Sequence, residues 1–208
     1  MARRPNPTPS TSSARTGAET RAEAQRVALA LFSEQGYEAT SMQQIADALG
    51  IRKASLYYHF AGKEEIVRSL LADRGDEAGE LAAWVEEQKP SAGLARETVV
   101  RWIDAQPADK LRGLRLLAAN PLLVRAVSAR SGVDVGASLE RVLDALVARM
   151  PPVGVAATAR RRILLRMAFG SLPAALASAA DVPGATEADA IAAARSAALA
   201  LAEAADSA

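Results

Sequence analysis

Residues 41–60 read SMQQIADALGIRKASLYYHF, and this stretch decides the fold. Its first half places apolar residues at helical spacing, which predicts a short helix with one buried face. Gly50 ends that helix, and a second short helix follows at about residues 52–59. Two short helices joined by a tight turn have the proportions of a helix-turn-helix. The residues expected to be buried between them are Met42, Ile45, Leu49, Ile51, Leu56 and Phe60.

The second of these helices has a polar side that suits a nucleic acid. No acidic residue lies between positions 52 and 59. Cationic and hydroxyl groups meet phosphates and base edges, whereas carboxylates would repel the phosphates. The alternative is a solvated basic face, but two adjacent tyrosines and a histidine are unusual on a face without a partner. The polar residues are Arg52, Lys53, Ser55, Tyr57, Tyr58 and His59.

Capping residues frame this motif. A helix is predicted from about residue 16 or 20 to residue 35, with Gly36 as its C-terminal cap. Each of the first two helices has two alternative N-caps followed three residues later by Glu or Gln, the spacing of a capping box. The alternatives are Thr16 or Thr20 for the first helix and Thr40 or Ser41 for the second.

Residues 36–64 resemble the N-terminal DNA-binding domain of the TetR family of transcriptional repressors. The Gly-Tyr and Thr-Ser start, the Ile-Ala and Leu-Gly pairs, Leu-Tyr-Tyr-His-Phe and Lys-Glu follow one another in the order and spacing of the family. The resemblance extends over about residues 19–70, and the rest matches only in length and helical character. The family often has Ser or Thr and Gly where this chain has Arg52 and Ala54, so operator preference cannot be transferred.

The resemblance implies a homodimer that binds double-stranded DNA at a palindromic operator and is typically released by a small-molecule inducer. Residue chemistry suggests the individual roles. Arg52, Lys53 and Ser55 are candidates for base edges, and Lys63 for a phosphate. The ring of Tyr37 is expected to pack while its hydroxyl reaches toward a phosphate. The expected DNA-binding residues are Thr40, Ser41, Arg52, Lys53, Ser55, Tyr57, Tyr58, His59 and Lys63.

Alanine dominates the composition and favours an all-α fold. The chain of 208 residues holds 49 alanines and only eight aromatic residues, and alanine is the best helix former and a poor strand former. Proline and glycine breaks separate the rest into helical segments. We expect a disordered basic arm at residues 1–18, a DNA-binding domain at 19–63 and a helical ligand-binding and dimerisation domain at 64–208. The segments predicted in the last domain are 63–88, 92–105, 107–119, 121–130, 135–149, 155–180 and 185–205.

The balance of basic and acidic residues differs between the DNA-binding region and the rest of the chain. Residues 1–63 carry eight basic and five acidic residues, whereas the remainder carries 17 basic and 19 acidic residues. Arg3, Arg4 and Arg15 in the arm are either solvated or in contact with DNA phosphates or the minor groove.

The last two helices are the candidates for dimerisation, because their many small residues allow close approach. Packing within one chain is the alternative. The residues expected at the interface are Ile163, Met167, Gly170, Ser171, Ala174, Ile191, Ala194, Ala198 and Leu201. An inducer is expected in the same domain, although residues of these types are individually more often ordinary core or members of a surface ion pair. The residues expected to bind it are Trp102, Arg115, Asn120, Arg166, Met167 and Phe169.

Composition and motifs narrow the function classes. The chain has no cysteine and one histidine, which argues against thiolate catalysis and cysteine- or multi-histidine metal sites. No cofactor and no enzyme activity are expected, since no paired-carboxylate or glycine-rich phosphate motif occurs. No membrane-spanning or signal segment is seen, so a soluble cytoplasmic protein is expected. The alternatives are a DNA-binding regulator without a ligand, a helical adaptor and a helical enzyme.

Overall fold

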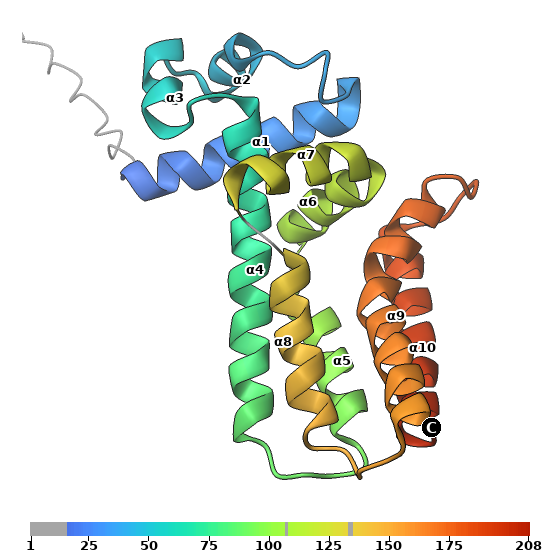
Figure 1. Cartoon of the computed structure of the whole chain (residues 1–208). Coiled ribbons are helices and arrows are strands. Elements are labelled where there is room, and N and C mark those ends of the chain that lie inside the picture. The colour runs from blue at the N-terminus through green and yellow to red at the C-terminus, as the bar shows by residue number, and fades with distance from the viewer. Residues whose placement is uncertain (1–15, 107, 133–134) are drawn as a thin grey trace, which may run out of the picture.

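The computed structural model describes residues 16–106, 108–132 and 135–208, and every regular element in them is a helix. The all-α prediction is therefore confirmed for this part of the chain. Figure 1 shows the N-terminal helices lying across one end of the bundle that the later helices form. The helices are α1 (Gly17–Gln35), α2 (Met42–Leu49), α3 (Lys53–His59), α4 (Lys63–Glu87), α5 (Leu94–Asp104), α6 (Ala108–Ala119), α7 (Pro121–Ser131), α8 (Val135–Val147), α9 (Val155–Ala179) and α10 (Glu187–Asp206).

Capping boxes fix where the first two helices begin. Thr16 is the N-cap of α1: its Oγ1 accepts from the Glu19 amide at 3.2 Å, and its own amide donates to the Glu19 carboxylate at 2.7 Å. Ser41 and Gln44 make the same reciprocal pair at the start of α2. The structure thus selects one residue from each pair of alternatives. Because α1 begins at Gly17, the helix starts inside the stretch expected to be the arm, whose residues 1–15 lie outside the described residues.

The core of the N-terminal region extends beyond the first three helices. Ile45, Leu56 and Phe60 are fully buried there, as the helix-turn-helix spacing predicts. Leu116 of α6 and Val127 of α7 belong to the same buried cluster. Figure 1 shows α6 and α7 beneath α1, between it and the rest of the bundle. The first three helices therefore rest on a platform that the second domain supplies.

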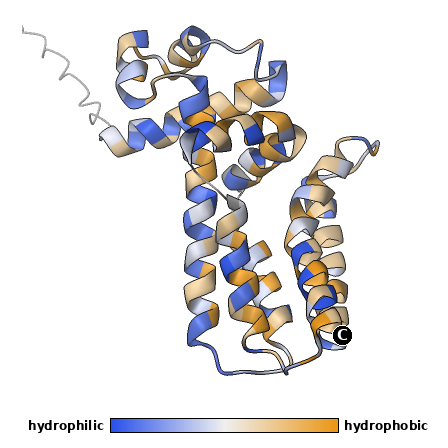
Figure 2. Cartoon of the chain, viewed as in Figure 1, coloured by the Kyte–Doolittle hydropathy of each residue, from blue (hydrophilic) through white to orange (hydrophobic). Residues whose placement is uncertain are grey.

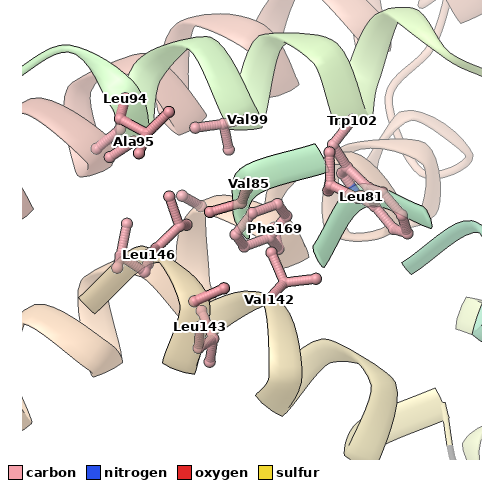
Figure 3. Packing of buried hydrophobic residues seen from close by; sticks show 14 of the residues in the cluster. Leu81, Val85, Leu94, Ala95, Val99, Trp102, Val142, Leu143, Leu146 and Phe169 are labelled. Atoms are coloured by element: carbon pink, nitrogen blue, oxygen red, sulfur yellow. The ribbon is translucent and has the colours of Figure 1, made fainter. Parts of the chain in front are cut away.

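A second core fills the bundle of α4, α5, α8, α9 and α10. Figure 3 shows aliphatic side chains of α4, α5 and α8 around Phe169 of α9, with Trp102 and Leu81 at one end. The Trp102 and Phe169 rings meet edge to face with centroids 6.0 Å apart. Buried alanines on α10 allow it to lie close along α9. These alanines are Ala190, Ala194, Ala198, Ala202 and Ala205.

Hydropathy follows this arrangement. Figure 2 shows hydrophilic and hydrophobic residues alternating along α4, as expected for a helix with one side against a core. Among the described residues, no helix is both long enough and apolar enough to cross a membrane. The same residues contain no cluster of three or more His, Asp or Glu side chains that could hold a metal ion.

Candidate nucleic-acid interface

The turn between α2 and α3 is closed by backbone hydrogen bonds. The Gly50 amide donates to the Asp47 carbonyl at 3.0 Å, and the Ile51 amide to the Ala46 carbonyl at 3.1 Å. Gly50 has φ +68°, a left-handed conformation that glycine adopts without steric cost. This geometry holds α3 directly after α2, with Leu56 turned into the core.

The opposite side of α3 is open to solvent. Arg52 is the N-cap of the helix and Lys53 its first residue, and both side chains are exposed together with Ser55. Tyr58 is 88% exposed, and its ring meets the His59 ring edge on at a centroid distance of 5.3 Å. An exposed aromatic ring of this size in a helix with no acidic residue suits contact with a polyanion.

Tyr57 completes this surface. It is partly exposed, and the Lys53 ammonium lies 5.9 Å from the centre of its ring, within the range of a cation–π contact. The predicted α3 residues therefore lie together on one short helix, on the surface outside its buried Leu56 side, with His59 half-buried. We call this surface, made of Arg52, Lys53, Ser55, Tyr57, Tyr58 and His59, the α3 face.

Thr40 and Ser41 were both predicted to contact DNA and were alternative N-caps of α2, and the structure separates them. Thr40 is buried, and its hydroxyl donates to the Gly36 carbonyl at 2.8 Å and accepts from the Gln35 amide group at 3.1 Å. The cap of α2 is therefore Ser41 and not Thr40, since the Thr40 hydroxyl is already occupied inside the protein. Ser41 remains exposed at the helix N-terminus, where backbone amides and the helix dipole favour an anion.

Lys63 lies at the first turn of α4 and reaches back to the loop before α2. Its Nζ donates to the backbone carbonyls of Tyr37 at 2.6 Å and Glu38 at 3.3 Å, and it lies 4.5 Å from the Tyr37 ring centre. An ammonium has three donors, so one remains for a phosphate. Burial, with the nearby Glu64 carboxylate, raises the pKa of Tyr37 to about 12, so its hydroxyl stays neutral.

Arg21 of α1 is a contributor that the sequence does not reveal. Its guanidinium donates to the His59 carbonyl at the end of α3 and lies 4.2 Å from the Phe60 ring centre. A cation at a helix C-terminus is favourable because the last carbonyls lack helical partners. Arg21 therefore holds the end of α3 against α1. The partners are separated by 38 positions, and no local spacing signals such a contact.

Comparison with known proteins places this geometry in a family. Residues 26–70 match the family model described as "Bacterial regulatory proteins, tetR family". This part of the chain is therefore similar to the DNA-binding region of the TetR family. This agrees with the resemblance seen in the sequence.

Curated relatives match over a short part of the chain. One is the biofilm operon icaADBC HTH-type negative transcriptional regulator IcaR of Staphylococcus epidermidis, 54% identical over 41 residues. Another is the HTH-type transcriptional repressor KstR2 of Mycobacterium tuberculosis, 51% identical over 51 residues. These matches cover 20% and 24% of this chain, and 22% and 26% of the relatives. The chain thus spans about a quarter of the length of these relatives.

Solved structures extend the similarity of fold to nearly the whole chain. A putative TetR-family transcriptional regulator from Mesorhizobium loti aligns with a TM-score of 0.57 at 24% identity, over 90% of this chain and 97% of that one. AmtR of Mycobacterium smegmatis aligns with a TM-score of 0.55 at 25% identity, over 93% and 89% of the two chains. The helical body therefore has the TetR fold although its sequence has diverged.

The residues predicted to bind an inducer in the TetR body do not form one group. Trp102 and Phe169 meet in the core. Arg115 lies 3.7 Å from Glu187 in an ion pair, and the Asn120 side chain donates to the Leu116 carbonyl at 2.8 Å. Arg166 pairs with Glu140 at the surface, and Met167 is exposed. The expected set thus divides between the core, two helix surfaces and a helix end.

The predicted dimerisation residues divide between two sides of α9 and α10. Ile163 is 60% exposed and Met167 53% exposed, and Ala174 follows on the same side of α9. Gly170, Ile191 and Leu201 are half-buried. Ser171, Ala194 and Ala198 are buried inside the protomer, where the alanines pack against other helices of the same chain. These last three residues are therefore not accessible for contact with a second copy of the chain.

Proposed function

We propose that the chain is a transcriptional regulator that binds double-stranded DNA through the α3 face. One observation carries this proposal: the polar side of α3 is exposed and free of acidic residues, while its apolar side is fixed in the core by Leu56. A rigidly held helix can place its N-terminal residues against base edges in the major groove. Arg52, Lys53 and Ser55 stand at that end.

Phosphate contacts would surround this helix. Tyr57, Tyr58 and His59 are placed along it to reach the DNA backbone, and Ser41 and Lys63 lie at the starts of α2 and α4. Hydrogen bonds to phosphates fix the register of a protein on DNA, and base contacts specify the sequence. The matched relatives are described as a negative regulator and a repressor, which supports repression as the regulatory outcome.

We further propose that the chain acts as a homodimer on a palindromic operator. The exposed apolar side chains of Ile163, Met167 and Ala174 recur at helical spacing along one side of α9. Small exposed residues of α10, among them Ala193 and Ala197, lie on the neighbouring helix. Two copies of this surface, related by a two-fold axis, would form a four-helix interface. Two α3 helices would then stand at least one DNA turn apart, about 34–36 Å.

Release by a small-molecule inducer completes the proposal. Two small pockets lie beside α4 and α6, and one of them also borders α1 while the other borders α5. A ligand that binds one arrangement of these helices more tightly than another would shift the DNA-binding equilibrium. A DNA-binding regulator that takes no ligand is the alternative, and its operator affinity would not respond to any small molecule.

Selection of genomic fragments with the purified protein, followed by footprinting, tests this function. We expect enrichment of fragments that share an inverted repeat, with two protected half-sites separated by about one helical turn or more. Binding should weaken steeply with salt, because phosphate contacts release counterions. Failure to enrich any sequence over a random pool at moderate salt would contradict DNA recognition and favour an adaptor.

A further inference from the structure

The two ends of α3 are held in different ways. At its start, backbone hydrogen bonds of Gly50 and Ile51 tie the helix to α2. At its end the contacts come from α1, whose first turns lie beside α3 in Figure 1. Between the ends, Leu56 is the buried residue of the helix. A helix of seven residues with one buried side chain depends on its ends for its orientation.

Arg21 makes three contacts at the end of α3. Its Nη1 donates to the His59 carbonyl, and its guanidinium lies 4.2 Å from the Phe60 ring centre. Its Nη2 lies 3.9 Å from the Glu65 carboxylate in the first turn of α4. The His59 ring also lies against α1, since a Cβ added at Gly17 would be 3.9 Å from His59 Cε1. Arg21 thus joins α1, the end of α3 and the start of α4.

The Glu65 carboxylate fixes the direction of this arginine. Arg68 holds the same carboxylate from its own helix, with Nε 2.7 Å from Oε2. The hydrogen bond from Arg68, together with the positive charges of Arg68 and Arg21, lowers the pKa of Glu65, so the carboxylate stays ionised at neutral pH. A half-buried carboxylate between two guanidinium groups is a firm anchor for both.

A small movement at the end of α3 would misdirect the side chains proposed to meet DNA. Seven residues span about 10 Å along a helix, so a shift of about 2 Å at one end tilts the helix by about 11°. Binding constellations must be held to within about 10–20° of their productive geometry. Such a tilt would move Tyr58 and His59 relative to the DNA backbone and would turn the whole α3 face relative to the bases.

We propose that Arg21 is a positioning residue for DNA recognition, and that Glu65 acts through it by holding its guanidinium in place. This inference rests on the proposed function, because it takes the α3 face as the surface that binds DNA. It gives Glu65 a role opposite to the one that its charge alone would give, since a carboxylate near DNA repels the phosphates. The competing explanation is a direct contact between Arg21 and a phosphate, which would contribute about one unit to the salt slope of binding.

Operator affinity and its salt dependence test the role of Arg21. The probes are a fragment enriched by the genomic selection and a random duplex of the same length. Arg21→Met keeps an aliphatic stem but removes the donors and the charge, and it should bind the operator about tenfold more weakly with an unchanged salt slope. On the random duplex it should bind as the parent does. Arg21→Lys keeps a donor for the His59 carbonyl and should recover most of the loss, and it also serves as the test variant if Arg21→Met does not fold.

Arg26→Met is the matched control for this variant. Arg26 is exposed on the same helix and pairs with Glu23, so its loss should change operator affinity by no more than about twofold. Parental affinity of Arg21→Met, or a salt slope lower by about one unit, would overturn the positioning role.

Glu65→Gln tests the second half of the proposal through the sign of its effect. It should weaken operator binding by about threefold although it removes a negative charge near the DNA. Glu38→Gln is the matched control, because Glu38 is exposed, lines the same surface hollow and keeps the backbone carbonyl that Lys63 binds. It should bind as tightly as the parent or more tightly.

The double variant Arg21→Met/Glu65→Gln shows whether Glu65 acts through Arg21. It should bind no more weakly than Arg21→Met alone, because contacting residues in one network do not contribute independently. Tighter operator binding by Glu65→Gln, or losses that add in the double variant, would overturn the role assigned to Glu65.

A measurement without DNA separates this inference from the proposed function. His59 is the only histidine in the chain, so its ring protons give one set of signals in nuclear magnetic resonance. We expect a nuclear Overhauser contact between His59 Hε1 and Gly17 in the parent and in Arg26→Met, and its loss in Arg21→Met, while circular dichroism shows that all three are folded. If Arg21→Met keeps this contact in a protein that binds the operator, the positioning role is overturned and the regulator stands. If the contact is lost as expected but the parent binds no DNA, the proposed function fails and Arg21 still holds the end of α3.

Discussion

Ile163→Asp should dissociate the dimer without unfolding the protomer. Ile163 is 60% exposed on α9, so an aspartate there stays in water when the protomer is alone. Substitutions at such surface positions usually change the free energy of unfolding by no more than about 0.5 kcal/mol. In the proposed dimer the same carboxylate would be buried without a partner, at a cost of about 3 kcal/mol or more.

Symmetry doubles this cost, because each protomer carries the substitution into the same isologous interface. The sum is roughly 6 kcal/mol, which corresponds to about four powers of ten in the dimer dissociation constant at 1.4 kcal/mol for each tenfold change. A dimer that is stable at nanomolar concentration would therefore be monomeric at micromolar concentration. Operator binding should be lost in parallel, since two linked α3 helices are needed for a palindrome.

Sedimentation velocity over a concentration series measures the dissociation constant, and thermal unfolding followed by circular dichroism checks that the protomer is folded. Leu122→Asp is the matched control: Leu122 is 77% exposed on α7 and lies outside the proposed interface. We expect it to remain dimeric. An Ile163→Asp protein that dimerises with the parental constant would place the interface elsewhere and refute the reasoning.

Three further perturbations test other parts of the structure. Ala198→Leu should destabilise the protomer by about 1–3 kcal/mol in urea unfolding, because Ala198 is fully buried between packed helices; a negligible change would show loose packing there. Lys63→Ala should weaken binding to all duplexes alike and reduce the salt slope by about one, and an unchanged slope would leave Lys63 only a positioning role. Tyr37 keeps its proton to a pKa of about 12, whereas the unfolded chain loses it near 10. Its contribution to stability is therefore complete below pH 10 and lost as the pH rises toward 12. Tyr37→Phe should remove this part of the pH dependence of unfolding, and a similar effect of Tyr58→Phe would contradict the assignment to burial.

The helix positions could be read from the sequence because their signals are local. Proline and glycine breaks place the ends of the helices within a few residues, and capping residues place the beginnings. The prediction of α3 as a helix with one polar side is confirmed because apolar residues at helical spacing fix which side is buried. Leu56 and Phe60 are both buried as predicted.

Long-range contacts could not be read in this way. Nothing near Arg21 indicates that it holds the end of α3, and nothing near Lys63 indicates that it binds carbonyls of the preceding loop. On α10 almost every residue is small, so periodicity does not separate the inward alanines from the outward ones. The structure alone places Ala194 and Ala198 inside and Ala193 and Ala197 outside.

The participation of α6 and α7 in the N-terminal core is another contact of this kind. Leu116 and Val127 lie far from the helix-turn-helix in sequence, yet they pack into its buried cluster. The predicted domain boundary after residue 63 therefore does not separate two cores, because helices after it contribute to the core of the N-terminal region.

Selection from a randomised operator tests the central claim most directly, because it asks whether α3 reads bases. The parent is compared with Arg52→Ala, Lys53→Ala and Ser55→Ala. A bidentate arginine–guanine contact discriminates by about 1–3 kcal/mol, so its loss should relax preference at one position in each half-site. The two positions must change together, since a homodimer presents the same helix twice. If all three variants select the parental site with unaltered preferences, α3 does not read bases and the proposed function loses its physical support.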